Sequence, residues 1–174
     1  MTETGIDAVT LKTELKNTFD SFINTLSLFT ADEVNKVPFE GSWTAGQVTE
    51  HILKSLRALP LLLEDSVIAA DRAPDEKCAA VRDLFLDFQA KFNSPESVLP
   101  TASRHDKGEL ITQLSDIKDQ ILAAVTTVDL SMLFTQFEFP GFGYLTRFEW
   151  FTFFAVHTQR HARQLKNIYE ALTN

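Results

Sequence analysis

Apolar residues recur every three or four positions along four long stretches of the chain, with polar residues between them. In the first stretch, from about Asp7 to Phe29, the apolar positions follow steps of four, four, three, four and three. This spacing matches the 3.6-residue period of an α-helix and predicts one buried face. The other stretches start near Thr44, Asp106 and Thr146 and show the same period. The pattern therefore predicts up to four main helices.

Polar residues at the start of these stretches are of the kind that cap helices. A Thr followed three residues later by Gln or Glu can form a capping box, in which each side chain bonds the backbone N–H of the other residue. An Asp with a carboxylate three residues further on gives a simpler N-cap. Capping boxes are predicted at Thr30–Glu33, Thr44–Gln47 and Thr146–Glu149, and the simpler cap at Asp106.

The segments between the helices are interrupted by prolines and glycines. Pro60 lies within the second apolar stretch, which weakens near residue 70, and we interpret it as a kink in one helix. Residues 79–92 are expected to form a shorter helix or an irregular arm, and residues 93–104 a loop. The Phe residues in 129–144 are too irregularly spaced to predict a strand. We therefore expect an all-α fold, a four-helix bundle with a long crossover between helices two and three.

The length and charge of the chain limit its function classes. With 174 residues, and about 150 residues in a typical domain, we expect a single domain over residues 1–174. The net charge of −8 and the lack of a Lys and Arg cluster argue against a nucleic-acid partner. No signal-peptide pattern and no run of about 18 apolar residues is visible, so we expect a cytoplasmic protein without a membrane span. Cys78, the one cysteine, has no His or basic residue at a spacing that would activate it.

Two of the four His residues lie four positions apart in the last predicted helix. His157 and His161 share one face there, at a spacing that lets both imidazoles reach one metal ion. His51 lies beside the apolar stripe of the second helix, and a metal site in a bundle is built from inward side chains on facing helices. Three imidazoles leave a fourth position open and suit Zn, Ni, Cu or Fe. Two alternatives stay open: His51 as a hydrogen-bonded residue at the core edge, and His157 and His161 as a solvated pair.

Each polar or aromatic residue near these His residues has two interpretations. Gln47 lies one helical turn before His51. It is expected either to orient the His51 ring or only to cap the helix. Trp150, two turns before the His pair, forms a pocket wall or part of the core. Arg160 and Arg163 are expected either to bind an anionic substrate or to form surface salt bridges, and we favour the salt bridges. The fourth His, His105, precedes a helix, and we expect it to be a surface loop residue.

Several segments resemble the DinB-like family, which includes the YfiT-type metal-dependent hydrolases. Residues 42–53 (SWTAGQVTEHIL) resemble the family's entry to helix two, where a Trp and a Ser or Thr precede the His. Residues 140–150 (PGFGYLTRFEW) are similar to its entry to the last helix, and residues 157–161 (HTQRH) to its His-x-x-x-His motif. Residues 92–100 look like a loop found in one branch. The matches occur in the family's order over nearly the whole chain.

The resemblance implies a fold, a cofactor and partners. The fold is a four-helix bundle with a long connection between helices two and three, and the cofactor is a divalent metal ion, usually nickel or zinc, on His51, His157 and His161. Family members often form homodimers. Some branches use mycothiol, bacillithiol or glutathione, as thiol-dependent transferases or as a maleylpyruvate isomerase. The chain departs from the family at none of the three ligand positions, and nothing in it identifies a particular thiol.

Two classes of function are therefore expected. The first is a metal-dependent enzyme with a small-molecule substrate, in which the three-His site activates water for hydrolysis or a low-molecular-weight thiol for transfer to a small electrophile. No general base stands out, so no catalytic residue is assigned beyond the ligands. The second is a non-catalytic metal-binding or stress-related module, in which the Phe-rich region 130–156 contacts a partner or a second copy of the chain.

Overall fold

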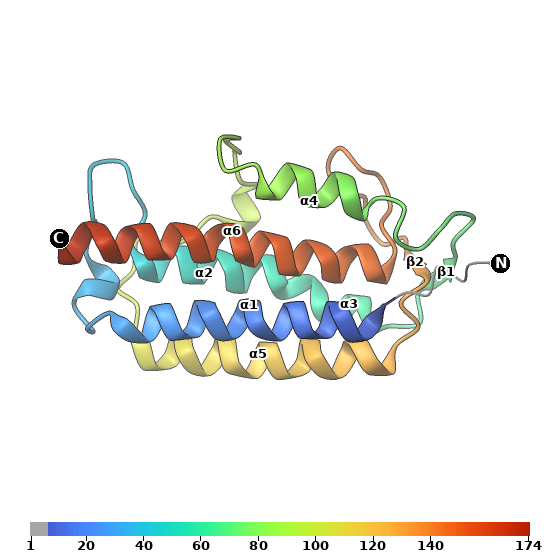
Figure 1. Ribbon diagram of the computed structural model, residues 1–174, viewed down its shortest axis with the longest axis horizontal. Coiled ribbons are helices and arrows are strands. Elements are labelled where there is room, and N and C mark those ends of the chain that lie inside the picture. The colour runs from blue at the N-terminus through green and yellow to red at the C-terminus, as the bar shows by residue number, and fades with distance from the viewer. Residues whose placement is uncertain (1–6) are drawn as a thin grey trace.

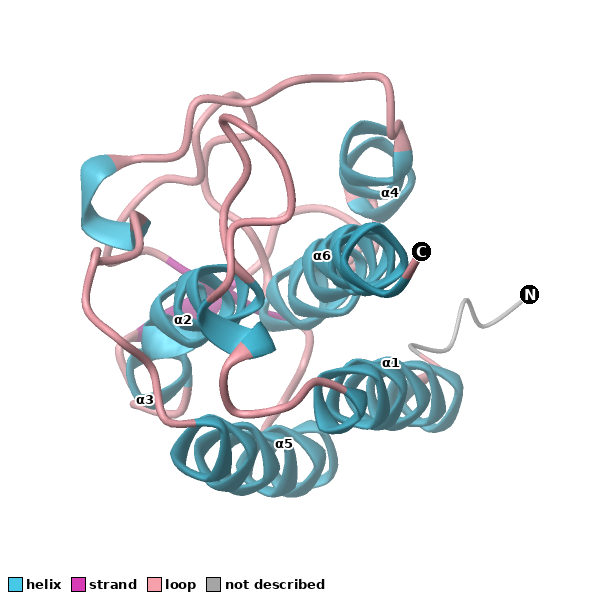
Figure 2. Cartoon of the chain, turned by 90° about the vertical axis from the view of Figure 1, so that its left-hand side faces the viewer, coloured by secondary structure: helices cyan, strands magenta, loops and turns pink. Residues whose placement is uncertain are grey.

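Four helices pack side by side as a bundle in the computed structural model, which describes residues 7–174 (Figure 1). They are α1 (Ala8–Leu28), α2 (Ala45–Ser55), α5 (Lys107–Thr127) and α6 (Arg147–Thr173). Seen from the end of the bundle (Figure 2), α1 lies beside α5 and α6, and α2 also contacts both. The predicted all-α four-helix bundle is confirmed. None of the helices within the described range has the length and hydropathy that a bilayer crossing requires.

The predicted caps determine where the bundle helices begin. At α2, the Thr44 hydroxyl accepts from the Gln47 N–H at 3.1 Å, and the Gln47 amide oxygen accepts from the Thr44 N–H at 3.0 Å. The same reciprocal bonds join Thr146 and Glu149 at the start of α6. Asp106 accepts from a backbone N–H in the first turn of α5 at 2.8 Å. Since each cap satisfies N–H groups that have no partner inside the helix, it fixes the residue at which that helix starts.

The first half of α6 is buried over most of its circumference because it packs on two sides. Its inner face contacts α1 and α2, and α4 (Cys78–Leu86) covers its outer side (Figures 1 and 2). Phe151 and Phe154 are fully buried on α6, as are Phe19 and Phe22 on α1. Burying a large apolar side chain contributes about 1.5–3 kcal/mol. This core therefore holds α6, and the His residues that follow on it, in a fixed position.

The second helix ends earlier than its apolar pattern predicted. α2 stops at Ser55, a 3₁₀ turn covers Leu56–Ala58, and a short helix α3 (Leu59–Leu62) follows. Pro60 lies in the first turn of α3, where its missing N–H costs no helical hydrogen bond. The prediction of one kinked helix extending to about residue 70 is therefore wrong, because Pro60 opens a new helix and does not bend an existing one.

A small antiparallel strand pair lies at one end of the bundle (Figure 1). Strand β1 (Val67–Ala69) pairs with β2 (Met132–Phe134), with Val67 opposite Phe134. The sequence predicted no strand in either segment, and this prediction is wrong for both. Three residues are too few for an alternating pattern to stand out, and the pairing joins segments far apart in the chain. A backbone bond from Phe134 to Leu145 links β2 to the start of α6 and fixes the angle at which α6 enters the bundle.

The crossover between α2 and α5 is long, as predicted, and contains structure of its own. A shorter helix was one of the two forms expected for residues 79–92, and α4, which ends at Leu86, confirms it. The chain after α4 is irregular apart from a 3₁₀ turn at Glu96–Val98. Residues 98–101 then lie against α2 through several hydrogen bonds. The crossover thus covers the side of the bundle on which the three His residues meet.

Candidate metal centre

The three His residues predicted to share a metal ion come together between α2 and α6. Nε2 of His157 lies 3.2 Å from Nε2 of His51 and 3.2 Å from Nε2 of His161. The ligand atoms of all three residues lie within 4.8 Å of one another. His157 is 8% exposed, so the alternative of a solvated His157–His161 pair does not fit, whereas His51 is 2% exposed and is hydrogen-bonded as its alternative described. The two helices therefore aim three imidazoles at one point.

Hydrogen bonds to the outer ring nitrogens of His51 and His161 fix which nitrogen of these two imidazoles carries the proton. Nδ1 of His51 lies 2.9 Å from the backbone carbonyl oxygen of Val98. Nδ1 of His161 lies 2.7 Å from the side-chain oxygen of Gln164. Because both oxygens can only accept, Nδ1 is the donor in each ring and Nε2 keeps its lone pair. Nε2 lone pairs thus point into the cluster, as metal ligation requires.

Burial keeps the imidazoles uncharged. It is the main cause that lowers the pKa of His51, with the bond to the Val98 carbonyl opposing it. Burial likewise lowers the pKa of His161 to about 3 and the pKa of His157 well below its ordinary value, and the charges of neighbouring His residues act in the same direction. All three rings are therefore neutral at pH 7, the form in which imidazole binds a metal ion.

The cluster fits a transition-metal ion. Tetrahedral ligands about 2.0–2.1 Å from a zinc ion lie about 3.3 Å from one another, close to the 3.2 Å that separates Nε2 of His157 from Nε2 of His51 and from Nε2 of His161. Without a cation or a proton between them, the inward lone pairs of His51 and His161 would face the third imidazole at this distance without compensation. Neutral nitrogen ligands suit zinc, nickel, copper or iron and do not suit magnesium or calcium. Three protein ligands leave one position for water or a substrate.

One face of α2 binds the crossover beside this cluster. Gln47, Glu50, His51 and Lys54 follow helical spacing, and each contacts residues 98–101. The Lys54 ammonium donates to the Leu99 carbonyl at 2.6 Å, the Gln47 amide donates to the Thr101 carbonyl at 3.0 Å, and the Glu50 carboxylate accepts from the Thr101 N–H at 2.9 Å. The Val98 carbonyl that orients His51 is therefore held in place from three neighbouring positions. The interpretation of Gln47 as a direct partner of the His51 ring is wrong, since it bonds the crossover instead.

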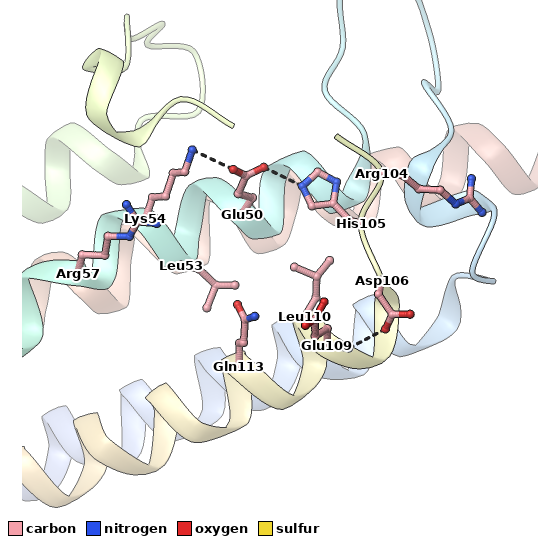
Figure 3. Close-up of a pocket in the computed structure, with 10 residues that line it drawn as sticks. All are labelled: Glu50, Leu53, Lys54, Arg57, Arg104, His105, Asp106, Glu109, Leu110 and Gln113. Carbon is pink, nitrogen blue, oxygen red and sulfur yellow. Dashed lines mark hydrogen bonds and ion pairs between the residues drawn. The ribbon is translucent and has the colours of Figure 1, made fainter. Parts of the chain in front are cut away.

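Glu50 connects this face to the segment before α5 (Figure 3). Its carboxylate lies 2.8 Å from Lys54 and 2.7 Å from Nε2 of His105. Burial alone would raise the pKa of Glu50, but hydrogen bonds from Lys54, His105 and Thr101 outweigh it and lower the pKa to about 2. The expectation that His105 is a surface residue is wrong: its side chain is 10% exposed, because the ring packs on Gly46, where a Cβ would lie 2.8 Å from it.

A large cavity opens over the three His residues. It has a volume of about 1320 Å³, and the lining includes all three imidazoles. The Phe153 ring stacks on His157 with centroids 5.0 Å apart, and Trp43 lies 5.2 Å from His51. Trp150 is 5% exposed, lies in the core and also lines the cavity, so both interpretations of it apply. The cluster is therefore accessible to a small molecule from one side.

The two arginines near the His pair do not form the salt bridges that we expected. The Arg160 guanidinium donates to backbone carbonyls after α4, including that of Asp87 at 2.8 Å, and lies 4.7 Å from the centre of the Phe92 ring. The Arg163 guanidinium lies 4.5 Å from the centre of the Phe88 ring. Both therefore anchor the end of the α4 segment over the cavity, and neither pairs with a carboxylate of residues 7–174.

Sequence reasoning missed two partners of the His residues. Gln164 lies three residues after His161 on the same helix, so helical spacing could have identified it. Val98 contributes only a backbone carbonyl, which leaves no side-chain signal, and it lies far from His51 in the chain. Burial raises the pKa of the Cys78 thiol to about 11, although Arg82, four residues further on, acts in the opposite direction. Burial, and not the absence of a nearby basic residue, is therefore the physical reason to expect an inert thiol.

Comparisons with known proteins give a family for this fold. A model of the DinB superfamily matches residues 14–165. The uncharacterized protein YuaE of Bacillus subtilis (strain 168) is 24% identical over 150 residues, which are 86% of this chain and 91% of YuaE. The solved structure of Bacillus subtilis YfiT, described as a probable metal-dependent hydrolase with an unusual four-helix bundle topology, matches with a TM-score of 0.64 at 14% identity. That match covers 98% of this chain and 90% of YfiT, and at such low identity it concerns the fold alone. Since the family model spans most of its length, the chain belongs to the DinB superfamily.

Proposed function

We propose that the protein is a metal-dependent enzyme in which His51, His157 and His161 hold a divalent cation, with nickel or zinc as the first candidates. The observation that carries this proposal is the convergence of the three imidazoles beneath a cavity of about 1320 Å³: Nε2 of His157 lies 3.2 Å from Nε2 of each of the other two rings, and all three ligand atoms lie within 4.8 Å of one another. When bound, such a cation lowers the pKa of a water or thiol at the open position and so supplies hydroxide or thiolate near neutral pH. The reaction we propose is hydrolysis or thiol transfer to a small electrophile.

The residues of the chain contribute to this chemistry in three ways. The Val98 carbonyl and the Gln164 amide oxygen hold the protons on Nδ1 of His51 and His161, which keeps Nε2 free on both rings. Burial keeps the rings neutral, so no proton competes for these lone pairs at pH 7. The aromatic rings beside His51 and His157 exclude water from two sides of the cluster, and this strengthens electrostatic interactions within it.

A decisive experiment compares the metal-loaded protein with His157→Ala, and with Lys16→Ala as the control. Metal content is measured first, and activity is then followed with 4-nitrophenyl acetate and with glutathione plus 1-chloro-2,4-dinitrobenzene. We expect His157→Ala to lose both the metal and whichever activity the wild type shows, and Lys16→Ala, which lies on the exposed side of α1 away from the cluster, to keep both. Activity that survives His157→Ala would contradict the enzyme proposal.

A second proposal, from a different class, is a non-catalytic metal-binding module that forms a homodimer. The supporting observation is that Phe39 is 57% exposed and Phe137 is 40% exposed at the cavity lining, although both are large apolar side chains. Single exposed apolar residues are common, but a cluster of them at one opening favours a contact. Light scattering of wild type and of Phe39→Ser tests the dimer, because only a dimer formed through this surface would dissociate, and the activity assay with His157→Ala separates a non-catalytic module from an enzyme.

A further inference from the structure

The wall of the cavity next to His157 is built from aromatic rings. The Phe85 ring lies 5.0 Å from Phe153 and 5.7 Å from His157, and Phe92 stacks on Phe85 with centroids 5.5 Å apart. Phe92 is 42% exposed, so an edge of this stack is accessible at the cavity, beside the Arg160 guanidinium that lies 4.7 Å from the centre of the Phe92 ring. Offset and edge-to-face packing between rings is favourable beyond the area that it buries. The exposed edge of the stack therefore favours a further planar ring over a polar or aliphatic group.

The charged residues around the same cavity are mostly cations. Arg160, Arg163 and Lys91 line it, and none of them pairs with a carboxylate among the residues that the structure describes. Glu138 is the one acidic residue in the described lining. This excess is unusual for a chain with a net charge of −8. Cations gathered at a cleft attract anionic ligands and raise their local concentration.

The metal ligands add no negative charge. All three are imidazoles, which stay neutral on binding, so a divalent ion held by them would keep its full charge at the base of the cavity. The charge at the base and the charge at the rim therefore have the same sign, while the wall between them is aromatic.

From this arrangement we infer that the cavity binds a small aromatic anion, with its ring against Phe85, Phe92 and Phe153 and its anionic group toward the His cluster. This inference rests on the proposed function, since it takes the three-His site as the reaction centre. It adds the substrate class: an aromatic compound that carries a carboxylate or a similar acidic group.

The test is a ligand series on the wild-type protein, measured by calorimetry with and without bound zinc. The probes are 2-naphthoate, its neutral counterpart 2-naphthamide, and acetate, which keeps the charge and lacks the ring. We expect the zinc-loaded protein to bind 2-naphthoate about tenfold more tightly than either of the other two, since both the ring and the charge contribute. Acetate or 2-naphthamide binding as tightly as 2-naphthoate would overturn the inference.

Variants of exposed residues then locate the binding site without disturbing the core. Phe92→Ala is expected to weaken 2-naphthoate binding about fivefold, whereas Tyr144→Ala, a ring of matching exposure outside the cavity lining, leaves it unchanged. Arg163→Gln is expected to weaken binding of 2-naphthoate and not of 2-naphthamide, with the exposed Arg104→Gln as its control. Equal effects of Phe92→Ala and Tyr144→Ala would place the ligand elsewhere and contradict the inference.

The metal-free protein separates failure of this inference from failure of the proposed function. The aromatic wall and the three rim cations are present without the metal, so 2-naphthoate is expected to bind more tightly than acetate in both forms. If this preference exists and His157→Ala retains activity, the substrate class stands and the enzyme proposal fails. If the protein binds zinc through the His residues but shows no preference for 2-naphthoate, the substrate class is wrong and the metal site stands.

Discussion

The carbonyl oxygen of Val98 lies 2.9 Å from Nδ1 of His51, and this contact connects the metal cluster to the crossover. The carbonyl has one acceptor role here: it holds the Nδ1 proton and leaves Nε2 free for a metal ion. Its position depends on the backbone of the next residue, Leu99, whose carbonyl accepts from the Lys54 ammonium at 2.6 Å. A side chain that does not touch the metal site therefore sets the orientation of one of its ligands.

Replacing Lys54 by Met should weaken metal binding without removing a ligand. The variant loses the bond to Leu99 and the ion pair with Glu50, so the carbonyl of Val98 is less well held. Loss of such an outer partner lowers metal affinity by about 10–100-fold in known sites, and we expect the lower end of this range. Competition with a chelator measures the effect. The control is Lys16→Met. This variant also breaks an ion pair between residues one helical turn apart, but the pair lies on α1, away from the cluster.

An unchanged affinity in Lys54→Met would show that the crossover does not position His51. The visible spectrum of the cobalt-substituted protein gives a second readout, because a reoriented imidazole changes the ligand field at the metal. A variant that is merely less stable would keep the wild-type spectrum once it is folded and loaded, so the two explanations lead to different results.

Replacing Arg72 by Met should destabilise the fold strongly. Arg72 donates to both oxygens of Glu149, at 2.6 and 2.7 Å, and the Glu149 side chain is fully buried in the first turn of α6. Removing one member of a buried ion pair leaves an uncompensated charge and costs about 3–5 kcal/mol. Urea unfolding of Arg72→Met measures the loss. Adding Glu149→Gln to this variant should recover part of it, because the unpaired charge is then gone.

The matched control for that measurement is Arg104→Met. Arg104 also lies 2.7 Å from a carboxylate, that of Asp32, but both side chains are mostly exposed. Exposed pairs contribute about 0–1 kcal/mol. A loss in Arg104→Met as large as that in Arg72→Met would contradict the argument that burial of Glu149 makes the difference.

Much of the fold could be predicted because the helices are long and each has a local start signal. The capping boxes at Thr44 and Thr146 involve residues three apart, so a single sequence contains both partners. The same is true of His157 and His161, whose shared face follows from helical spacing. To predict that His51 lies beside this pair, one further assumption was needed, namely that inward side chains on facing helices converge.

What could not be predicted depends on contacts between distant segments. The β1–β2 pair joins residues from two connections, and neither strand is long enough to show a period. His105 becomes buried only because α2 has a Gly at position 46 and an acid at position 50 that face it. The Val98 carbonyl belongs to the backbone, so no residue type marks it. The contacts of Val98 and His105 with α2 form only when the distant segments fold together.

The contact between α1 and α4 should make stability depend on pH through Glu14. Hydrogen bonds from Arg82 lower the pKa of Glu14, burial opposes this, and a bond from Gln159 adds to the lowering. The unfolded chain therefore binds a proton at Glu14 more readily than the folded one, so stability is full above the unfolded pKa and is lost as pH falls below it. Urea unfolding of wild type and Glu14→Gln between pH 5 and pH 3 tests this. The wild type should lose more stability over this window, and parallel curves would contradict the assignment.

Cys78 should react far more slowly in the folded protein than in the unfolded chain. Burial raises the pKa of its thiol to about 11, and the Thr152 hydroxyl, 3.4 Å from Sγ, opposes this only in part. The thiolate is the reacting form, so at pH 8 the folded protein holds about a hundredfold less of it than a free cysteine does. Reaction with 5,5′-dithiobis(2-nitrobenzoate), in buffer and in 8 M urea, measures the ratio of the rates. Rapid labelling of the folded protein would contradict the burial of this thiol, whereas slow labelling, together with full activity of Cys78→Ala, would exclude Cys78 as a nucleophile and leave the His cluster as the reaction centre.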